Sequence, residues 1–593
     1  MPAAILVAEG VDLGIAVRDV QQGTALLGEA RDNLGTSPEQ WTPGRVAASA
    51  RLQARAQPLI VAGCTRLDND PGLGLAGRLP VLGDQARAAL DLCDAAVAAG
   101  GAFADFVKVG TAYLGEAKDQ KPPGRRLLSL LAETQVPLAD AESRLGPALR
   151  RLDEDQKLAL VAPLKSRLHI AAAQLRPAEA QAAASSVAAR FLPSALGAQQ
   201  PMTYLVLLEN PSEIRPSGGL IGSAGTVTFD QGSPTQLDLH DYDALNPLFK
   251  ERLPVPSPLD RYLEFYKNSL ELGDAGWDPD FPTTARLTEA MYKSAVPSDL
   301  QGTLSVDPYA VAALLKVTGP VDVPGYGTFT SDDFFAKLNN IVNARIDTTV
   351  GKQALPAVAQ EVLKQVLAQP VSSWPALLSV IQQQAINRHV QIYMHDAGAQ
   401  QALVAARYDG STLTAASDDY LMLIDANVGG TKGDWFVHKT LDLKTEVYAG
   451  GLSRHELQVT YQMPAAVDAA DRLLNPGDGS YRDYVRFYLP EQASVASFQI
   501  LLDGQPVATA PDRIYLEHGK QVVGGFFSVP RGHQAVIRLA YEVPLQESRQ
   551  YTLYLQKQAG VLDLPATISV SYPGGSDRRT TGLERDQVLS YRW

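Results

Sequence analysis

The sequence predicts a multidomain chain that combines an N-terminal helical region, a central α/β domain and a C-terminal β-sandwich. The spacing of hydrophobic residues changes from a period near 3.6 at the start of the chain to a period of 2 at its end. Between these two regions, strand-like and helix-like segments alternate. A chain of 593 residues has room for several domains of ~100–200 residues each. We therefore place the domains at residues 1–195, 196–430 and 431–593.

Residues 1–195 are predicted to form a helical bundle or stalk. Alanine, leucine, glutamine, arginine and glutamate dominate this region, and all are good helix formers. Segments 68–84 and 118–126 are rich in proline and glycine and indicate loops between long antiparallel helices. Apolar residues at helical spacing form two stripes, Ala86, Leu90, Cys93, Val97 and Gly100, then Leu138, Ala141, Leu145, Leu149 and Leu152. A stalk, spacer or docking surface is expected here rather than a cofactor site.

Residues 196–430 mix strands and helices. "TYLVLL" (203–208) is typical of a buried strand, and "GTVTF" and "TQLDLHDY" alternate as half-buried strands do. Further on, "DPYAVAALLKVTG" predicts a helix whose start is marked by Asp307 and Pro308. This order favours an α/β layer fold.

Residues 431–593 alternate apolar and polar side chains in short runs. "HELQVTYQM", "YVRFYLP" and "VIRLAYEVP" are separated by turn signals such as "NPGDGS" and "LDGQP". Short strands at this spacing predict a β-sandwich. No convergent acid or base groups stand out in this region, so binding or packing is its expected role.

Charge and composition exclude several classes of function. A net charge of −13 argues against nucleic-acid binding and against broad adhesion to anionic lipid. The apolar start "MPAAILVAEGVDLGIAV" is interrupted by Glu9 and Asp12, and it lacks the basic residues of a secretory signal. We therefore expect membrane association only through an anchor that is not present in this chain.

Cys64 and Cys93 are the two cysteines of the chain. Their number and spacing exclude a disulfide framework and the usual zinc motifs. One bridge between them is an open alternative in an oxidising compartment. Two separate thiols buried in helices are the preferred interpretation.

The stretch "ENPSEIRPSGGLIGSAG" (209–225) contains the main candidate site. Arg215 follows a predicted buried strand, and Gly218, Gly219 and Gly222 come directly after it. The functional hypothesis is an anion site in which free backbone N–H groups and the guanidinium hold a phosphate or carboxylate. Lys352, at a predicted helix start, is expected to face the same space. The structural alternative is a turn that needs positive φ, with Arg215 in an ion pair.

Asp238, His240 and Asp241 form a second, weaker candidate. A strand over "TQLDLHD" would place Asp238 and His240 on one face. Carboxylates and imidazole can hold a divalent metal ion, and Mg²⁺ would suit phosphate transfer. A solvated strand face that ends in an acidic loop is the alternative, and the sequence favours it.

The segment "YLVLLENPSEIRPSGGLIGSAGTVTFDQG" resembles the signature of a bacterial family named domain of unknown function 4012 (DUF4012). "RLPVLGD", "SVDPYAVAALLKVTGPVDVPGYG", "ANVGGTKGDWFVHK" and "YRDYVRFYLP" agree with it in order. The resemblance implies an uncharacterised envelope protein. Members usually carry a transmembrane helix before the helical region, which this chain lacks, and the rest lies outside the cytoplasm.

The middle domain is also distantly similar to the LytR–CpsA–Psr family, which transfers glycopolymers from a polyprenyl-pyrophosphate carrier to the cell wall. Arg215 matches the first arginine of that family's loop, but Ser217 and Gly218 stand where its aspartate is expected. The second corner reads His240-Asp241 and lacks the arginine. The later helix start, Gly351-Lys352-Gln353, keeps one cation.

Taken together, these resemblances imply an extracytoplasmic protein of the cell envelope or surface. It would act in envelope or surface-glycan assembly by binding, or by binding and transferring, a polyprenyl-phosphate glycan or cell-wall polymer. Whether it is an enzyme stays open, and any enzyme activity would be a LytR–CpsA–Psr-like phosphotransfer. The alternative function is a non-enzymatic structural or adhesive surface protein that self-assembles into homo-oligomers.

Overall fold

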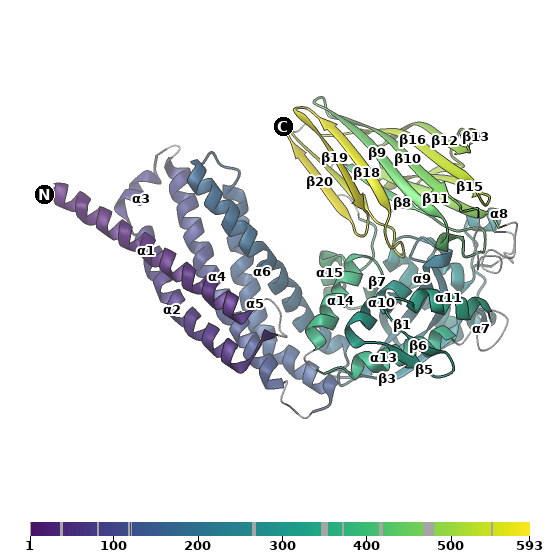
Figure 1. Cartoon of the computed structure of the whole chain (residues 1–593), viewed down its shortest axis with the longest axis horizontal. Helices are drawn as coiled ribbons and strands as arrows, with labels where there is room; N and C mark the ends of the chain where they lie inside the picture. Colours follow the sequence, from purple (N-terminus) through teal and green to yellow (C-terminus); the bar gives the residue numbers. More distant parts are fainter. Residues whose placement is uncertain are drawn as a thin grey trace. The chain divides into compact units, whose positions relative to one another are not determined.

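The computed structural model describes residues 2–35, 40–79, 82–116, 119, 121–263, 269–344, 354–370, 373–413, 419–465, 479–546 and 549–593. The chain divides into two compact units (Figure 1). The helical unit comprises Met1–Met202 with residues 229–233 and 369–375. The remaining residues from 203 to 593 form the second unit, which contains a mixed α/β part and a strand-rich part.

Long helices build the helical unit. Each long helix packs on the next one along the chain, α1 on α2, α2 on α4, α4 on α5 and α5 on α6. Thr42 and Asp70 cap the starts of α2 and α3 by accepting a backbone N–H bond, and proline follows each cap. The helices are α1 (Pro2–Leu34), α2 (Pro43–Asp68), α3 (Pro71–Ala76), α4 (Leu82–Glu116), α5 (Pro123–Asp155) and α6 (Ala162–Ala195).

Alanine and leucine side chains form the core between α4, α5 and α6. The predicted stripe from Leu138 to Leu152 on α5 is buried, which confirms the helical period inferred from the sequence. Alanines such as Ala88, Ala95 and Ala141 let neighbouring helix backbones approach closely. Among the described helices, none has both the length and the apolar character that crossing a bilayer requires.

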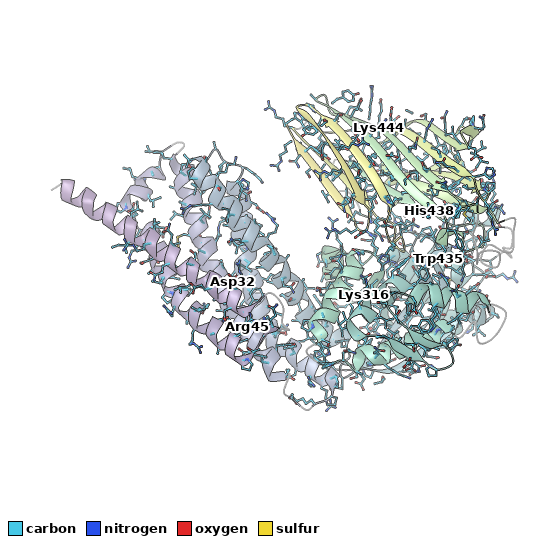
Figure 2. The ribbon with its side chains drawn as sticks, in the orientation of Figure 1. Asp32, Arg45, Lys316, Trp435, His438 and Lys444 are labelled. Carbon is cyan, nitrogen blue, oxygen red and sulfur yellow. A yellow bond between two sulfur atoms is a disulfide. The ribbon has the colours of Figure 1, made fainter. Side chains whose placement is uncertain are left out.

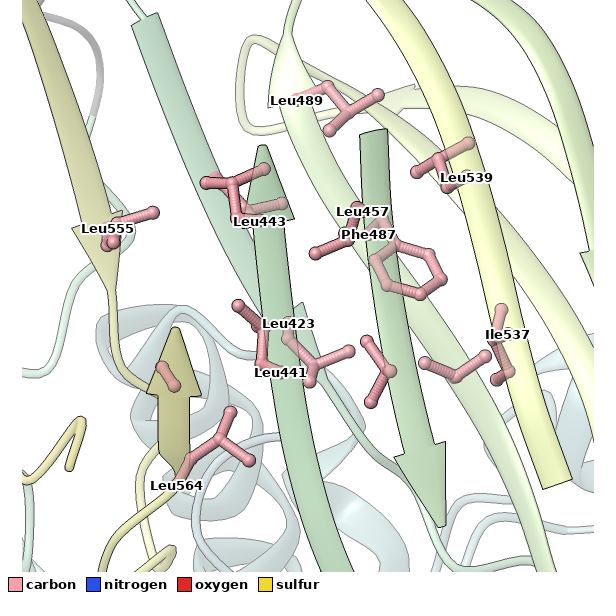
Figure 3. Packing of buried hydrophobic residues seen from close by; sticks show 14 of the residues in the cluster. Leu423, Leu441, Leu443, Leu457, Phe487, Leu489, Ile537, Leu539, Leu555 and Leu564 are labelled. Atoms are coloured by element: carbon pink, nitrogen blue, oxygen red, sulfur yellow. The ribbon is translucent and has the colours of Figure 1, made fainter. Parts of the chain in front are cut away.

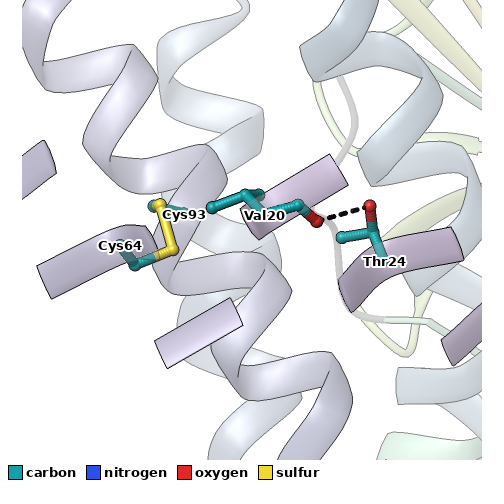
Figure 4. The surroundings of a disulfide bond; sticks show 4 residues. All are labelled: Val20, Thr24, Cys64 and Cys93. Carbon is teal, nitrogen blue, oxygen red and sulfur yellow. Dashed lines mark hydrogen bonds between the residues drawn. A yellow bond between two sulfur atoms is a disulfide. The ribbon is translucent and has the colours of Figure 1, made fainter. Parts of the chain in front are cut away.

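A disulfide joins Cys64 on α2 to Cys93 on α4, with 5.5 Å between the two Cα atoms (Figure 4). The preferred interpretation of two separate buried thiols was therefore wrong. Each cysteine was correctly expected on a helix. The packing of α2 against α4, which brings Cys64 and Cys93 together beside Ile60, is a tertiary contact that residue spacing does not reveal.

A five-stranded mixed sheet forms the centre of the α/β part, in the order β3-β2-β1-β4-β7. Strand β1 runs parallel to β4, and β4 runs antiparallel to β7. The strands are β1 (Met202–Asn210), β2 (Leu220–Asp230), β3 (Ser233–Asp241), β4 (Leu300–Val306) and β7 (Val390–Met394), and β5 (Val321–Val323) pairs separately with β6 (Gly327–Phe329). The helices are α7 (Tyr242–Leu245), α8 (Ser257–Tyr262), α9 (Phe281–Ala295), α10 (Pro308–Thr318), α11 (Phe334–Ala344), α13 (Ala354–Leu367), α14 (Trp374–Ile386) and α15 (Ala397–Ala406).

Two sheets form the strand-rich part, one of seven strands in the order β13-β12-β16-β10-β9-β18-β19 and one of six in the order β14-β15-β11-β8-β17-β20. The strands are β8 (Asp419–Ile424), β9 (His438–Tyr448), β10 (Leu452–Gln462), β11 (Tyr481–Pro490), β12 (Ser494–Leu502), β13 (Gln505–Ala508), β14 (Arg513–Glu517), β15 (Lys520–Val529), β16 (Gln534–Pro544), β17 (Gln550–Gln556), β18 (Pro565–Tyr572), β19 (Gly575–Gly582) and β20 (Gln587–Arg592).

The inner faces of these two sheets share one apolar core (Figure 3). Leu441 and Leu457 come from the seven-stranded sheet, and Leu423 and Phe487 come from the six-stranded sheet. The predicted order of helical, mixed and strand-rich regions is confirmed. Strand β8 precedes residue 431 but pairs with β11 and β17, so the sandwich takes its first strand from before the boundary chosen on sequence.

Candidate functional site

The loop after β1 places Arg215 in the protein interior. Its side chain is 1% exposed. The Nε donates to Asp274 Oδ1 at 2.6 Å, Nη2 to Glu213 Oε1 at 2.9 Å, and Nη1 to the Ile214 carbonyl at 3.1 Å. Burial alone would lower the pKa of Arg215, but the carboxylates of Asp274 and Glu213 outweigh it and raise the pKa above its ordinary value. The guanidinium is therefore charged and bound within the protein.

Close packing explains two of the three glycines predicted for this loop, Gly218 and Gly219. Gly218 has φ +144°, and a Cβ there would overlap the Glu209 carboxylate. A Cβ on Gly219 would meet the backbone of Asn210. Gly222 lies within β2 and has ordinary space around it. The loop is thus packed against the end of its own preceding strand.

The geometry around Arg215 is that of the structural alternative, because each guanidinium nitrogen already donates to an internal acceptor. An anion in this loop would compete with two carboxylates for the same nitrogens. Lys352, the expected second cation, lies outside the described residues.

The metal candidates lie on β3. Asp238 Oδ1 and His240 Nε2 are 3.0 Å apart, and both side chains are roughly half exposed. Asp241 instead accepts the backbone N–H of Asp243 at 3.0 Å and caps the short helix α7. Within the described part of the chain, no group of three or more His, Cys, Asp or Glu side chains converges as a metal site. The arrangement matches a solvated strand face followed by a capped turn.

Sequence reasoning missed a buried polar cluster at the end of the sandwich nearest this loop. We call it the Lys439 cluster. Its members are buried or half-buried at one end of the sandwich, and each forms a side-chain hydrogen bond with another member. They are Asp425, Asp434, Lys439, Tyr461, Tyr481 and Asp483.

Lys439 and Asp425 form the centre of the cluster. The Lys439 Nζ donates to Asp425 Oδ2 at 2.8 Å, and Tyr461 Oη donates to Asp425 Oδ1 at 2.6 Å. The side chains of Lys439 and Asp425 are 13% and 3% exposed. Burial alone would lower the pKa of Lys439, but Asp425 outweighs it and raises the pKa.

Asp434 connects the cluster to the Arg215 loop. Its Oδ2 accepts from the Ile214 backbone N–H at 3.1 Å and from Asn427 Nδ2 at 2.8 Å. Its Oδ1 accepts from Tyr481 Oη at 2.9 Å. Both oxygens of Asp434 are thus occupied by neutral donors, and burial raises its pKa.

Within the Lys439 cluster, Asp483 is the carboxyl group that has an oxygen without a hydrogen-bond partner. Its Oδ1 lies 3.2 Å from the same Tyr481 Oη that donates to Asp434, and its Oδ2 has no hydrogen-bond partner among the described residues. Burial, followed by the charges of Asp425 and Asp434, raises the pKa of Asp483 well above its ordinary value, against the effect of Lys439. Protonation of Asp483 is therefore favoured by burial and by the neighbouring carboxylates.

The alternation of side chains along the strands could have predicted that Lys439 and Asp483 are buried. Lys439 shares a strand face with Leu441 and Leu443, and Asp483 shares one with Val485 and Phe487. A charged residue in phase with core residues at a strand end is expected to be buried and paired. Which partners meet could not be inferred, because they come from different strands.

The comparisons with solved structures are weak. A proposed nutrient-binding protein of Legionella pneumophila matches 30% of this chain and 68% of its own, at 9% identity and a TM-score of 0.20. A variant of the M1 zinc metallopeptidase of Deinococcus radiodurans, bound to a Tyr-Ser-Ala substrate, matches at 12% identity and a TM-score of 0.14. This second match covers 25% of this chain and 40% of the peptidase chain. Neither likeness bears on the fold or activity of this protein.

No protein with curated annotation matches the sequence significantly. A family model described as "Protein of unknown function (DUF4012)" matches residues 199–342, about a quarter of the chain, and this segment includes the Arg215 loop. Over these residues the match supports the resemblance to the DUF4012 family that the sequence motifs indicate.

Proposed function

We propose that this chain is a non-enzymatic structural or adhesive protein of the extracytoplasmic cell envelope that associates with further copies of itself. The observation that carries the proposal is a pair of sheet edges with exposed apolar side chains. Val507 on β13 is 60% exposed, and Ile514 and Leu516 on β14 are 47% and 62% exposed. Strand β13 ends the seven-stranded sheet and β14 ends the six-stranded sheet. Unpaired apolar edges are templates for pairing with another chain.

The disulfide supports an extracytoplasmic location. A bond between Cys64 and Cys93 persists in oxidising compartments and is rare in the cytoplasm. The DUF4012 match over residues 199–342 is consistent with the envelope setting implied by the sequence resemblance.

The competing function is binding or transfer of a phosphate-linked glycan lipid by a LytR–CpsA–Psr-like central domain. That function would need Arg215 to exchange Asp274 and Glu213 for a phosphate. Leaving two carboxylates buried without their cation is costly. The paired state of Arg215 therefore favours the structural role.

Sedimentation of the purified chain tests the association. We expect concentration-dependent oligomers that Val507→Lys weakens, because a lysine on an edge strand opposes pairing. Val404→Lys is the matched control, since Val404 is 45% exposed on helix α15 and lies on neither sheet edge. A monomer at all concentrations, or equal effects of both substitutions, would contradict the proposal.

Two further measurements test the competing function and the extracytoplasmic location. Titration with a polyprenyl-phosphate analogue should show no binding, and saturable binding lost in Arg215→Lys would favour the competing function. A reporter active only outside the cytoplasmic membrane, fused to the C-terminus of the native gene product, should be active. Reporter activity confined to the cytoplasm would contradict the location.

A further inference from the structure

The Lys439 cluster has the components of an amide-forming site. Asp425 follows β8 in the six-stranded sheet, and Lys439 is the second residue of β9 in the seven-stranded sheet. The contact between their side chains therefore crosses from one sheet of the sandwich to the other. We propose that the Lys439 Nζ and the Asp425 Cγ form an intramolecular amide bond that links the two sheets covalently.

The reacting groups are held in contact. The Nζ of Lys439 lies 2.8 Å from Asp425 Oδ2, and Tyr461 holds the other carboxylate oxygen at 2.6 Å. Tyr461 is also the cross-strand partner of Lys439 in the β9–β10 ladder, so backbone pairing positions it. Two groups fixed at this separation react as if at very high local concentration.

The surroundings keep bulk water away from the pair. Asp425 and Lys439 line a cavity of about 30 Å³ together with Leu421, Leu423 and Leu441. Gln556, Lys557 and Gln558 also line this space, which has room for about two water molecules but not for bulk water. Since the side chains of Asp425 and Lys439 are only 3% and 13% exposed, loss of both charges on amide formation removes their desolvation cost.

Asp483 is the carboxyl group that strand pairing places next to the Asp425 segment. It forms a β-bridge with Asn427, and the next residue, Tyr484, donates its N–H to the Ala426 carbonyl at 2.9 Å. Asp483 therefore lies on the strand alongside the Asp425 segment, on the core-facing side. Its Oδ2 has no hydrogen-bond partner within the described residues, so this oxygen is not engaged elsewhere, and we assign it the role of proton relay for the pair.

Formation of the amide between Lys439 and Asp425 requires no oxidant and no added reactant. The ion pair first transfers a proton from the Lys439 ammonium to the Asp425 carboxylate. The amine lone pair then attacks Asp425 Cγ and forms the C–N bond. A proton then passes from the nitrogen to the departing hydroxyl, with Asp483 as the proposed relay, and the C–O bond breaks. One amide and one water result, and two buried charges disappear.

Asp434 is a less suitable electrophile than Asp425. Its two oxygens accept hydrogen bonds from Tyr481, Asn427 and the Ile214 backbone, and none of these donors is an amine nucleophile. The inference does not depend on the proposed function, because it concerns a modification of the chain itself.

Intact-mass measurement of the purified, reduced chain tests the bond. We expect a mass lower than that of the sequence by one water, retained after full denaturation. Trypsin should leave Lys439 uncut and release a branched peptide that joins residues 408–432 to residues 433–444. A full sequence mass, with ordinary cleavage after Lys439, would overturn the proposal without any variant.

Variants locate the bond. Lys439→Arg and Asp425→Ala should both restore the full mass, and Lys444→Arg should keep the loss of water. Lys444, which is labelled in Figure 2, lies on the same strand as Lys439. It is the matched control, since its Nζ is 4.0 Å from Glu456 in an exposed pair. Loss of water that persists in Lys439→Arg would place the modification elsewhere and overturn the proposal.

A separate variant tests the role assigned to Asp483 in amide formation. Asp483→Asn should leave most of the chain at full mass while circular dichroism shows a folded sandwich. Complete bond formation in that variant would overturn the acid–base role assigned to Asp483.

Discussion

Gly560 illustrates at the level of one residue how tightly the Arg215 loop is packed. It adopts φ +75°, and a Cβ there would overlap the backbone carbonyl of Gly218. The glycines that the sequence presents as an anion-binding loop thus meet another glycine from the sandwich. Close backbone approach, rather than ligand binding, accounts for both Gly218 and Gly560.

Substitution of Gly560 separates packing from backbone strain. Gly560→Ala should lower the free energy of unfolding by about 1–2 kcal/mol for the left-handed backbone and by a further ~1–3 kcal/mol for overpacking. Gly504→Ala is the control, because Gly504 has φ +80° but open space around its Cα. Denaturant melts of the two variants should differ by the packing contribution, and equal losses would contradict the close approach.

Arg215 is expected to contribute to stability. Arg215→Met should reduce the free energy of unfolding by about 3–5 kcal/mol, because Glu213 and Asp274 would stay buried without their cation. Arg261→Met is the control, since Arg261 is 64% exposed and its pair with Asp512 should contribute at most about 1 kcal/mol. Similar losses in chemical denaturation of the two variants would rule out the buried ion pair.

At the scale of elements, the helical unit depends on contacts between helices whose cores are built largely of alanine and leucine. Alanine buries little apolar area, so each contact stabilises the unit modestly. The disulfide between α2 and α4 adds a covalent constraint where this core is thin. It closes a loop with a sequence separation of 29 residues.

Removing the disulfide should destabilise the helical unit. A loop of this length corresponds to roughly 3–4 kcal/mol of lost stabilisation in the chain-entropy model. Cys64→Ser with Cys93→Ser, or reduction of the native chain, should lower the thermal midpoint seen by far-ultraviolet circular dichroism. Reductant should leave the double variant unchanged, and a native chain insensitive to reductant would show that the bond is absent.

At the scale of the whole molecule, Lys557 links the two parts of the second unit. Its Nζ donates to the Asn387 carbonyl at 2.6 Å, at the end of the α/β helices, and to the Gln558 carbonyl at 3.2 Å in the sandwich. Burial lowers the pKa of Lys557 to about 7, and the nearby carboxylate of Asp307 only partly offsets this effect. A charged lysine is therefore disfavoured in the folded state.

The pH dependence of stability follows from this pKa. In the unfolded chain a lysine has a pKa of about 10.4, so between about pH 7 and pH 10 the unfolded state binds the extra proton. Stability of the native chain relative to Lys557→Met should then rise with pH by up to ~1.4 kcal/mol per unit. Below about pH 7 the difference should be constant. Urea melts across this range measure it, and a difference that falls as pH rises would contradict the buried, neutral lysine.

The sequence by itself determined the order of helical, mixed and strand-rich regions, because the period of hydrophobic residues is a local property of each segment. It also determined that Arg215 follows a buried strand and that the two cysteines lie on helices. Tertiary structure decided which groups meet. Arg215 pairs with Asp274 from a segment 59 residues away, Cys64 meets Cys93 across two helices, and Lys439 meets Asp425 across two sheets. Charge pairing and burial depend on the space between elements, so only the packing reveals that Arg215 is buried in an ion pair.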